Sequence, residues 1–324
     1  MPLYPLTFEP ILKERVWGGR KLERLYGKKL RGASPVGESW EISDRVGDVS
    51  VVAEGPLAGK DLHWLIEKFG PDLTGQAPLC EGRFPLLIKI LDAREKLSLQ
   101  VHPPARKAAE LGGEAKTELW YVAQAAPEAE LYVGLKRGCT RDEFARRVRD
   151  GTVESCFHRV RVNAGDAMFL PSGRVHALGA GLVIFEIQQN SDTTYRVFDW
   201  NRVGLDGKAR ELHIEESLES IDFEDFEPGL VRPSGAQERA LLVKDPLFGV
   251  ELLRMTGAEN LALEKGTMQI LGIVSGEVRV QGGRVEVALG PGQFCLVPAS
   301  LADTVVRAQG RASLLRVEAG EAAK

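Results

Sequence analysis

Cysteine is scarce in this chain of 324 residues, and its four cysteines show no C-x-x-C spacing. Neither a disulfide framework nor a thiolate metal site is therefore predicted, and buried small side chains are the simpler interpretation. No stretch approaches the roughly 20 consecutive apolar residues that span a membrane as a helix. The first residues also lack the basic segment and apolar run of a signal peptide. We expect a cytosolic (cytoplasmic) protein without a membrane partner.

An excess of positive charge is also missing. The formal net charge is -4 at pH 7, and 27% of the residues are charged. A nucleic acid or an anionic membrane surface is therefore not expected as the main partner, although a local basic pocket stays open. The length suits about two domains of roughly 150 residues each.

Helix signals are few and short. Apolar residues at helical spacing predict a helix over 62–69, and the segments 105–115 and 210–222 also favour helices. Thr140 and Glu143 form a capping box, which predicts a further helix start. The remaining chain consists mostly of short apolar segments punctuated by Gly and Pro. We therefore predict a mainly β fold.

Three polar side chains share one face of a predicted strand. Ser98, Gln100 and His102 alternate with apolar residues, and alternate side chains of a strand point the same way. A surface strand would alternate too, but it usually carries Lys, Glu or Thr, and this one ends in two prolines. Lys89 lies on the preceding strand, where an ordinary exposed lysine would also fit. Glu118 begins a later strand.

An earlier strand has a less certain pattern. Trp40 and Ile42 alternate with Glu41, which places the two apolar side chains on the core face and Glu41 on the other. A solvated Glu41 is the simpler interpretation, and a role in a pocket is the alternative.

The segment 162–199 carries the densest group of polar residues. A Pro-Ser-Gly break places His176 at the start of a strand. On the next strand Glu186 points away from the face that holds Phe185. The polar run 188–196 then has more hydrogen-bonding groups than a simple connection needs. We interpret this segment as the floor of a polar pocket.

The chain also repeats itself. Gly165 and Gly292 are each followed six residues later by proline, and five residues further on by His176 in the first copy and Asp303 in the second. Only the first copy is therefore equipped for metal chemistry. Two copies of one all-β unit predict tandem jelly-roll barrels with a few short inserted helices, because this architecture protects the edges of short strands. The expected domains are residues 1–234, which bind the metal, and residues 235–324, which do not.

Four residues of the first copy resemble the two cupin motifs. Gln100-x-His102, Glu118 and His176 follow the motif order, with Gln in place of the first His. Neutral imidazoles combined with carboxylate and amide oxygens suit a divalent ion such as Zn²⁺. Composition alone leaves Mn²⁺, Co²⁺ and Fe²⁺ open as alternatives.

A more specific resemblance extends over most of residues 1–220. It is carried by WGG at Trp17, GESWEIS at Gly37, LSLQVHP at Leu97, AKTELWY at Ala115, PSGRVHAL at Pro171 and EIQQNSDTTYRVFDW at Glu186. Together these motifs resemble the type I mannose-6-phosphate isomerases, in the short bacterial form. Ala115, where relatives often have Gly, is a small departure that affects no catalytic position.

The resemblance implies an enzyme that interconverts the hexose phosphates mannose 6-phosphate and fructose 6-phosphate, with one zinc ion per chain. The implied zinc ligands are Gln100, His102, Glu118 and His176. The implied catalytic residues are Arg196, Lys116, Glu186 and Asp192, and Ser98 and Lys89 resemble positions that meet the phosphate.

Moving a proton between C1 and C2 requires a base and stabilisation of an enediol-like oxygen. Arginine stays protonated in proteins, so we assign Arg196 to charge stabilisation or substrate clamping. Lys116 and Glu186 are the two candidates for proton transfer, and the sequence does not choose between them.

Two other functions remain as alternatives. A non-catalytic sugar-phosphate sensor on the same fold would keep a polar pocket but lose the metal ligands or the arginine, which this chain has. A cupin iron oxygenase would favour an imidazole-rich site and would give the segment 186–199 no role. The oligomeric state cannot be predicted from this sequence.

Overall fold

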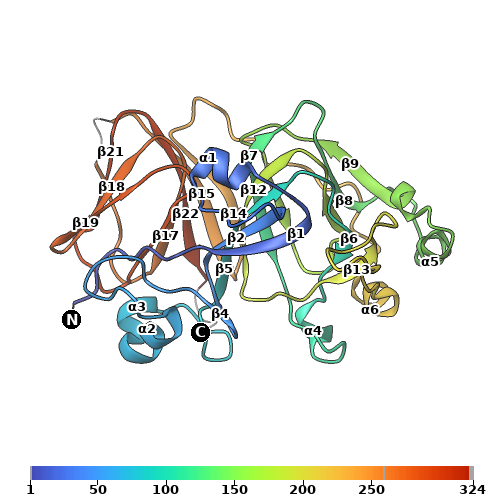
Figure 1. Cartoon of the computed structure of the whole chain (residues 1–324), viewed down its shortest axis with the longest axis horizontal. Helices are drawn as coiled ribbons and strands as arrows, with labels where there is room; N and C mark the ends of the chain where they lie inside the picture. Colours follow the sequence, from blue (N-terminus) through green and yellow to red (C-terminus); the bar gives the residue numbers. More distant parts are fainter. Residues whose placement is uncertain (1, 258–259, 321–324) are drawn as a thin grey trace.

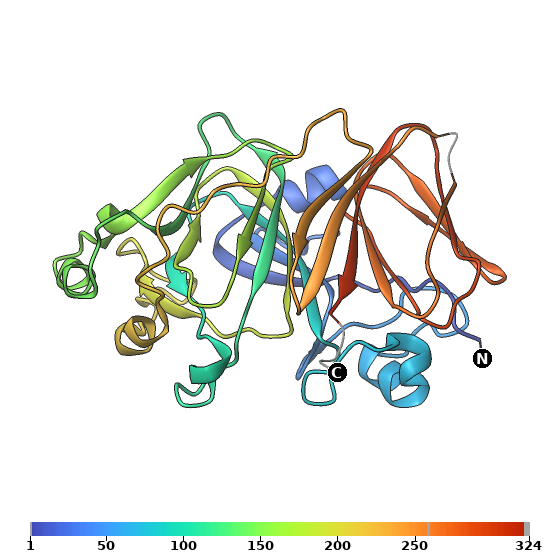
Figure 2. The same ribbon diagram turned by 180° about the vertical axis from the view of Figure 1, so that it is seen from behind.

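Antiparallel strands are the main regular elements of the computed structural model, which describes residues 2–257 and 260–320. Two β-barrels lie side by side (Figure 1), the first coloured blue to yellow and the second orange to red. The view from behind shows the same division (Figure 2). Over the described residues, no helix has the length and apolar character needed to cross a bilayer.

Two sheets face each other in the first barrel. The larger runs in the order β1 (Ile11–Gly19), β2 (Val36–Ile42), β5 (Leu86–Ala93), β12 (Leu182–Gln189), β7 (Glu118–Ala125) and β10 (Ala167–Leu170). The smaller runs in the order β13 (Tyr195–Phe198), β6 (Leu99–Val101), β11 (His176–Leu178), β8 (Glu130–Leu135) and β9 (Phe157–Arg161). A short hairpin of β3 (Asp44–Arg45) and β4 (Asp48–Val49) follows β2.

The second barrel repeats this strand order. Its larger sheet runs β14 (Arg239–Lys244), β15 (Phe248–Met255), β22 (Ala312–Ala319), β17 (Gln269–Ser275) and β20 (Phe294–Val297). Its smaller sheet runs β16 (Asn260–Ala262), β21 (Val305–Ala308), β18 (Val278–Gly282) and β19 (Val285–Leu289). Strands β2, β5, β12, β7 and β10 thus correspond to β14, β15, β22, β17 and β20. The predicted fold class, mainly β with tandem cupin-type barrels, is confirmed.

The expected match of Asp303 with His176 is wrong. Asp303 is exposed and lies in the loop before β21, with a φ of 55°. The buried Val306 pairs with Leu261 of β16, just as His176 pairs with Gln100 of β6. The loop after the proline is longer in the second copy, so counting along the sequence stops short of the strand.

The helices are short and lie at the ends and outside of the barrels (Figure 1). They are α1 (Lys21–Tyr26), α2 (Leu62–Phe69), α3 (Pro71–Thr74), α4 (Ala105–Ala108), α5 (Arg141–Arg149) and α6 (Ile214–Ser220), with a 3-10 turn at Val153–Cys156. The predicted N-cap is confirmed, because the Thr140 hydroxyl accepts a hydrogen bond of 3.2 Å from the backbone N–H of Glu143.

The helix expected over 105–115 is wrong beyond its first turn. The chain leaves the helix before Gly112, whose φ is 68°. A Cβ on Gly113 would lie 2.5 Å from the Tyr195 hydroxyl. Two glycines therefore let the chain turn closely past β13 on its way to β7.

A bulge in β2 decides which face Trp40 occupies. The register shifts between Trp40 and Ile42, which pair with Lys89 and Ile88 of β5. The two side chains therefore lie on opposite faces of the sheet, and the expectation that they share one is wrong. Glu41 is not solvated either, because it is 5% exposed and lies 2.7 Å from the Lys28 ammonium.

One hydrophobic core joins the larger sheets of the two barrels. Phe185 of β12 contacts Phe294 of β20, with ring centroids 5.4 Å apart. Leu6 exchanges two backbone hydrogen bonds of 2.8 Å with Leu296 of β20. The second barrel thus covers the outer face of the first barrel's larger sheet, and the inner face remains for the site.

Candidate active site

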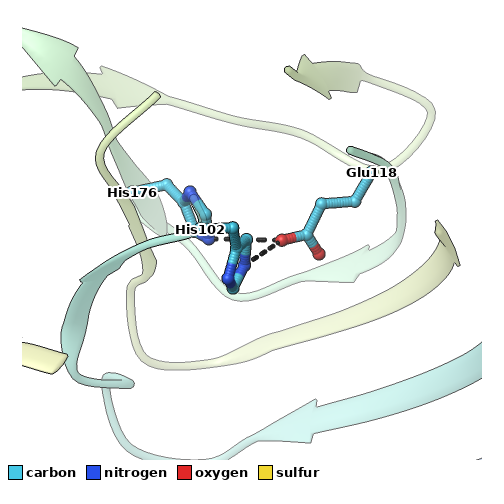
Figure 3. Close-up of side chains that lie close together, drawn as sticks. All are labelled: His102, Glu118 and His176. Atoms are coloured by element: carbon cyan, nitrogen blue, oxygen red, sulfur yellow. Dashed lines mark hydrogen bonds and ion pairs between the residues drawn. The ribbon is translucent and has the colours of Figure 1, made fainter. Parts of the chain in front are cut away.

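The two sheets of the first barrel bring four predicted metal ligands together. Gln100 and His176 are direct partners on β6 and β11 of the smaller sheet. His102 directly follows β6, and Glu118 begins β7 in the larger sheet. Residues separated by as many as 76 positions therefore meet inside one barrel. Figure 3 shows three of the four, His102, Glu118 and His176.

The cluster is compact and buried. The Glu118 Oε1 atom lies 2.6 Å from the His102 Nε2 atom and 3.3 Å from the His176 Nε2 atom. Gln100 adds its side-chain amide, 3.2 Å from the His176 Nε2 atom. The two imidazoles and the carboxylate are each at most 1% exposed, and their ligand atoms lie within 4.8 Å of one another.

Hydrogen bonds prepare these side chains to bind a cation. The His176 Nδ1 atom lies 2.9 Å from the Arg174 carbonyl, which can only accept, so Nδ1 carries the proton and Nε2 presents a lone pair. Glu118 Oε2 and His102 Nδ1 are buried without hydrogen-bond partners. Orphaned polar atoms of this kind are costly in a protein interior unless they bind something.

The protonation states also suit a metal. Burial lowers the pKa of His102 to about 3, and the positive charge of Lys116 acts in the same direction. Burial opposes ionisation of Glu118, but Lys116 and His102 hold the pKa of Glu118 well below its usual value. A neutral imidazole and an ionised carboxylate are the forms in which these residues bind metals.

A cavity of about 600 Å³ adjoins the cluster. The predicted residues that line it are Lys89, Ser98, Gln100, Lys116, Glu186, Asp192 and Arg196. Because Gln100 lines the cavity and contacts His176, it connects the metal cluster to the place where a small molecule can enter.

A row of cross-strand neighbours on the larger sheet provides the floor of this cavity, to which Lys89, Glu186 and Trp120 contribute. Trp40, Lys89, Glu186 and Trp120 lie directly opposite one another on β2, β5, β12 and β7. The Trp120 indole N–H donates a 2.8 Å hydrogen bond to Glu186 Oε1, and the Lys89 ammonium lies 3.3 Å from Glu186 Oε2. Each oxygen of the Glu186 carboxylate therefore has a fixed partner.

Burial and neighbouring charges shift the pKa values of the two charged residues in this row, Glu186 and Lys89. Burial, aided by the negative charge of Glu118, raises the pKa of Glu186 to about 7. Burial acts against the charge of Lys89, but Glu186 and Glu38 raise the pKa of Lys89 above its ordinary value. The alternative reading of Lys89 as an ordinary exposed lysine is wrong, since it is 3% exposed.

The remaining predicted residues lie around the rim and walls. The Lys116 ammonium is 3.9 Å from Glu118 Oε1, close to the metal cluster. Arg196 on β13 donates a 2.7 Å hydrogen bond to the Glu211 carbonyl, while its buried Nε has no partner. Burial lowers the pKa of Arg196, and the positive charges of Arg210 and Arg202 add to this effect.

Five charged residues of the cavity were not predicted, namely Glu14, Arg15, Glu38, Asp206 and Arg210. Arg15 and Glu38 form a pair at 2.6 Å, in which Glu38 also accepts a 2.7 Å hydrogen bond from the Trp40 indole. Arg210 lines the cavity from the segment that follows β13. The GESWEIS motif contains Glu38 and was a usable signal, whereas Arg15 and Arg210 stand in segments without a periodic pattern.

The fold and the cluster define a cupin-type protein with a candidate metal centre in its first barrel. A family model described as phosphomannose isomerase type I, catalytic domain, matches residues 6–138. Mannose-6-phosphate isomerase ManA of Bacillus subtilis is 35% identical over 309 residues, which cover 94% of this chain and 96% of that protein.

Solved structures agree with this. The crystal structure of a mannose 6-phosphate isomerase from Bacillus subtilis has a TM-score of 0.87 at 29% identity, covering 97% of this chain and 99% of that one. A zinc-bound mannose 6-phosphate isomerase has a TM-score of 0.78 at 17% identity, covering 98% and 99%, and so shares the fold. This chain belongs to the type I mannose-6-phosphate isomerase family.

Proposed function

We propose that this protein interconverts mannose 6-phosphate and fructose 6-phosphate by moving a proton between C1 and C2 of the sugar. The observation that carries the proposal is one cavity in which a buried His102–Glu118–His176 cluster adjoins the acid–base residues Lys116 and Glu186. Such a cavity offers both a metal centre and groups that can accept and return a proton.

Zinc is the proposed metal, held by Gln100, His102, Glu118 and His176. The orphaned oxygen of Glu118, the fixed tautomer of His176 and the combination of two imidazole nitrogens with carboxylate and amide oxygens support this assignment. When bound, zinc supplies a Lewis acid that polarises a sugar oxygen. The stoichiometry is one ion per chain, because Leu261, Leu263, Gln269 and Val306 stand at the corresponding positions of the second barrel.

Glu186 is the proposed proton-transfer base. Its carboxylate lies on the cavity floor, and Trp120 and Lys89 hold both of its oxygens in place. Such fixing is what a base that must reach one carbon-bound proton requires. Lys116, which is close to Glu118, is proposed to contact the sugar oxygens and to serve as their proton donor.

Arg196 and Asp192 complete the site in this proposal. Arg196 stabilises the negative charge that develops on the enediol-like oxygen, because its guanidinium lines the cavity and keeps an unpaired Nε. Asp192 is exposed on the cavity rim, where a carboxylate can accept hydrogen bonds from sugar hydroxyls.

Ser98 and Lys89 are the proposed contacts for the phosphate end of the substrate. Both are buried and line the cavity. Glu186 and Glu38 already balance much of the positive charge of Lys89, so most of the phosphate charge must be met by other residues.

The proposed organisation places this chemistry in residues 1–234 and a metal-free barrel in residues 235–324. A cytosolic setting is supported by the four free thiols, since disulfides are rare there. Free hexose 6-phosphates are the proposed partners, with neither nucleic acid nor membrane.

A turnover assay tests the proposed function. Zinc-loaded protein is expected to convert mannose 6-phosphate into fructose 6-phosphate and to run the reaction in reverse. Binding of mannose 6-phosphate without conversion would favour a sugar-phosphate sensor and would overturn the proposal.

A further inference from the structure

Arginines crowd the segment that follows β13. Arg196, Arg202 and Arg210 lie close enough that the latter two act on the pKa of Arg196. Among the residues that the structure describes, Asp199 alone forms ion pairs with this group, at 2.7 Å to Arg202 and 2.6 Å to Arg210. One carboxylate thus holds two guanidiniums beside a third, which leaves an excess of positive charge.

This segment forms a small hairpin at the cavity rim. Trp200 and Asn201 take left-handed conformations, with φ values of 56° and 53°, and Val203 bridges to Ala209. Gly204, Leu205, Asp206 and Arg210 line the same 600 Å³ cavity as Arg196. The Asp206 carboxylate is engaged in the turn, where it accepts a 3.0 Å hydrogen bond from the backbone N–H of Lys208.

Hydrogen bonds tie the base of the hairpin to the segment that leads into β6 and contains Ser98. The Trp200 indole N–H donates to the Leu97 carbonyl at 2.7 Å, and Arg202 donates to the Lys96 carbonyl at 2.6 Å. Arg210 and Ser98 therefore face one end of the cavity. The carboxylates of Glu38 and Glu186 lie on the larger sheet that forms the floor.

We propose that Arg210, held by Asp199 at this end of the cavity, is a specificity-determining residue that binds the phosphate monoester of the substrate and selects phosphorylated over free hexoses. This inference rests on the proposed function and names a further contact of the same site. Two oxygens of Asp199 fix the Arg210 side chain, through Nε at 2.7 Å and Nη2 at 2.6 Å. Its Nη1 atom is left for an anion, and the excess of arginines favours a doubly charged one.

The test compares R210Q with the wild type in three measurements. We expect the KM for mannose 6-phosphate to rise about tenfold to a hundredfold with little change in kcat, which is the scale of one charge-assisted hydrogen bond. The inhibition constant of inorganic phosphate should rise by a similar factor. The inhibition constant of unphosphorylated mannose should stay nearly constant, because mannose lacks the phosphate that Arg210 is proposed to bind.

Two further variants separate a phosphate contact from a structural role. R210K should recover part of the phosphate affinity, whereas R232Q, which removes an exposed arginine outside this cavity, should change nothing. If R210Q weakens mannose and phosphate equally, the residue only supports the hairpin and the inference fails. An unchanged KM and unchanged phosphate inhibition would also overturn it.

The phosphate site at Arg210 can be tested independently of the proposed isomerase reaction. Calorimetric titration of inorganic phosphate into the wild type and R210Q needs no turnover. Phosphate binding that depends on Arg210 in a protein without isomerase activity would refute the proposed reaction and keep the anion site. Turnover by the wild type, together with phosphate binding that is identical in the wild type and R210Q, would support the proposed reaction and refute the anion site at Arg210.

Discussion

Glu118 and Gln269 occupy the same position in the two barrels. Glu118 of β7 pairs with Leu170 of β10, and Gln269 of β17 pairs with Val297 of β20. Both side chains are at most 1% exposed, but the second has an amide where the first has a carboxylate. The same strand framework therefore supports a charged cluster in one barrel and a largely apolar interior in the other.

Metal analysis should detect one zinc ion per chain, bound in the first barrel. Glu118→Gln, which makes the first barrel like the second at this position, should remove most of the bound zinc because an amide is a weaker ligand than a carboxylate. Gln269→Met is the matched control and should leave the metal content unchanged. A second tightly bound ion that survives Glu118→Gln would show that the second barrel also binds metal.

Two histidines give a contrasting pair of variants. His176→Ala should reduce bound zinc and activity together, because His176 belongs to the buried cluster. His213→Ala should keep the zinc, since His213 precedes α6 and accepts a 3.3 Å hydrogen bond from the backbone N–H of Arg196. Circular dichroism must show that both variants are folded. Loss of zinc in His213→Ala, with zinc retained in His176→Ala, would show that His213 and not His176 is a metal ligand.

Arg196 should act on turnover more than on binding. A guanidinium that stabilises charge in the transition state contributes there and much less in the ground state. We expect Arg196→Ala to lower kcat by about a hundredfold to a thousandfold, and Arg196→Lys to recover only part of it because an ammonium lacks the planar fork. A raised KM with unchanged kcat, at full zinc content, would instead make Arg196 a substrate clamp.

The shared core between the barrels predicts a stability effect far from the cavity. Phe294→Ala should lower the free energy of unfolding by about 3–5 kcal/mol, because it opens a cavity against Phe185. Leu241→Ala, at a side chain that is 56% exposed, should change it by less than about 0.5 kcal/mol. Chemical denaturation measures both. Equal effects would contradict the packing of the second barrel against the first.

Much of the first barrel could be predicted because local patterns act on one strand at a time. The alternation around Gln100 and His102 and the break before His176 placed three of the clustered side chains correctly. Glu186 was also assigned to the correct face of its strand. In each case the side-chain direction follows from the strand period of two.

The features that were not predicted depend on tertiary structure, which local sequence patterns do not record. The bulge at Glu41 changes the face of Trp40, and it is stabilised by Lys28, thirteen residues away. Because the loop before β21 is longer in the second copy, counting residues from the proline does not identify the position that matches His176. Arg210 reaches the cavity because Asp199 holds it there, which no periodic pattern records.

The central claim is that this cavity moves a proton between two sugar carbons. The most direct test is conversion of mannose 6-phosphate in heavy water by the zinc-loaded wild type and by Glu186→Gln, with NMR or mass analysis of the product carbons. We predict that the wild type forms fructose 6-phosphate with solvent deuterium at C1, whereas Glu186→Gln keeps its zinc but loses both turnover and exchange. An undiminished rate of turnover in Glu186→Gln at full zinc content would contradict this account.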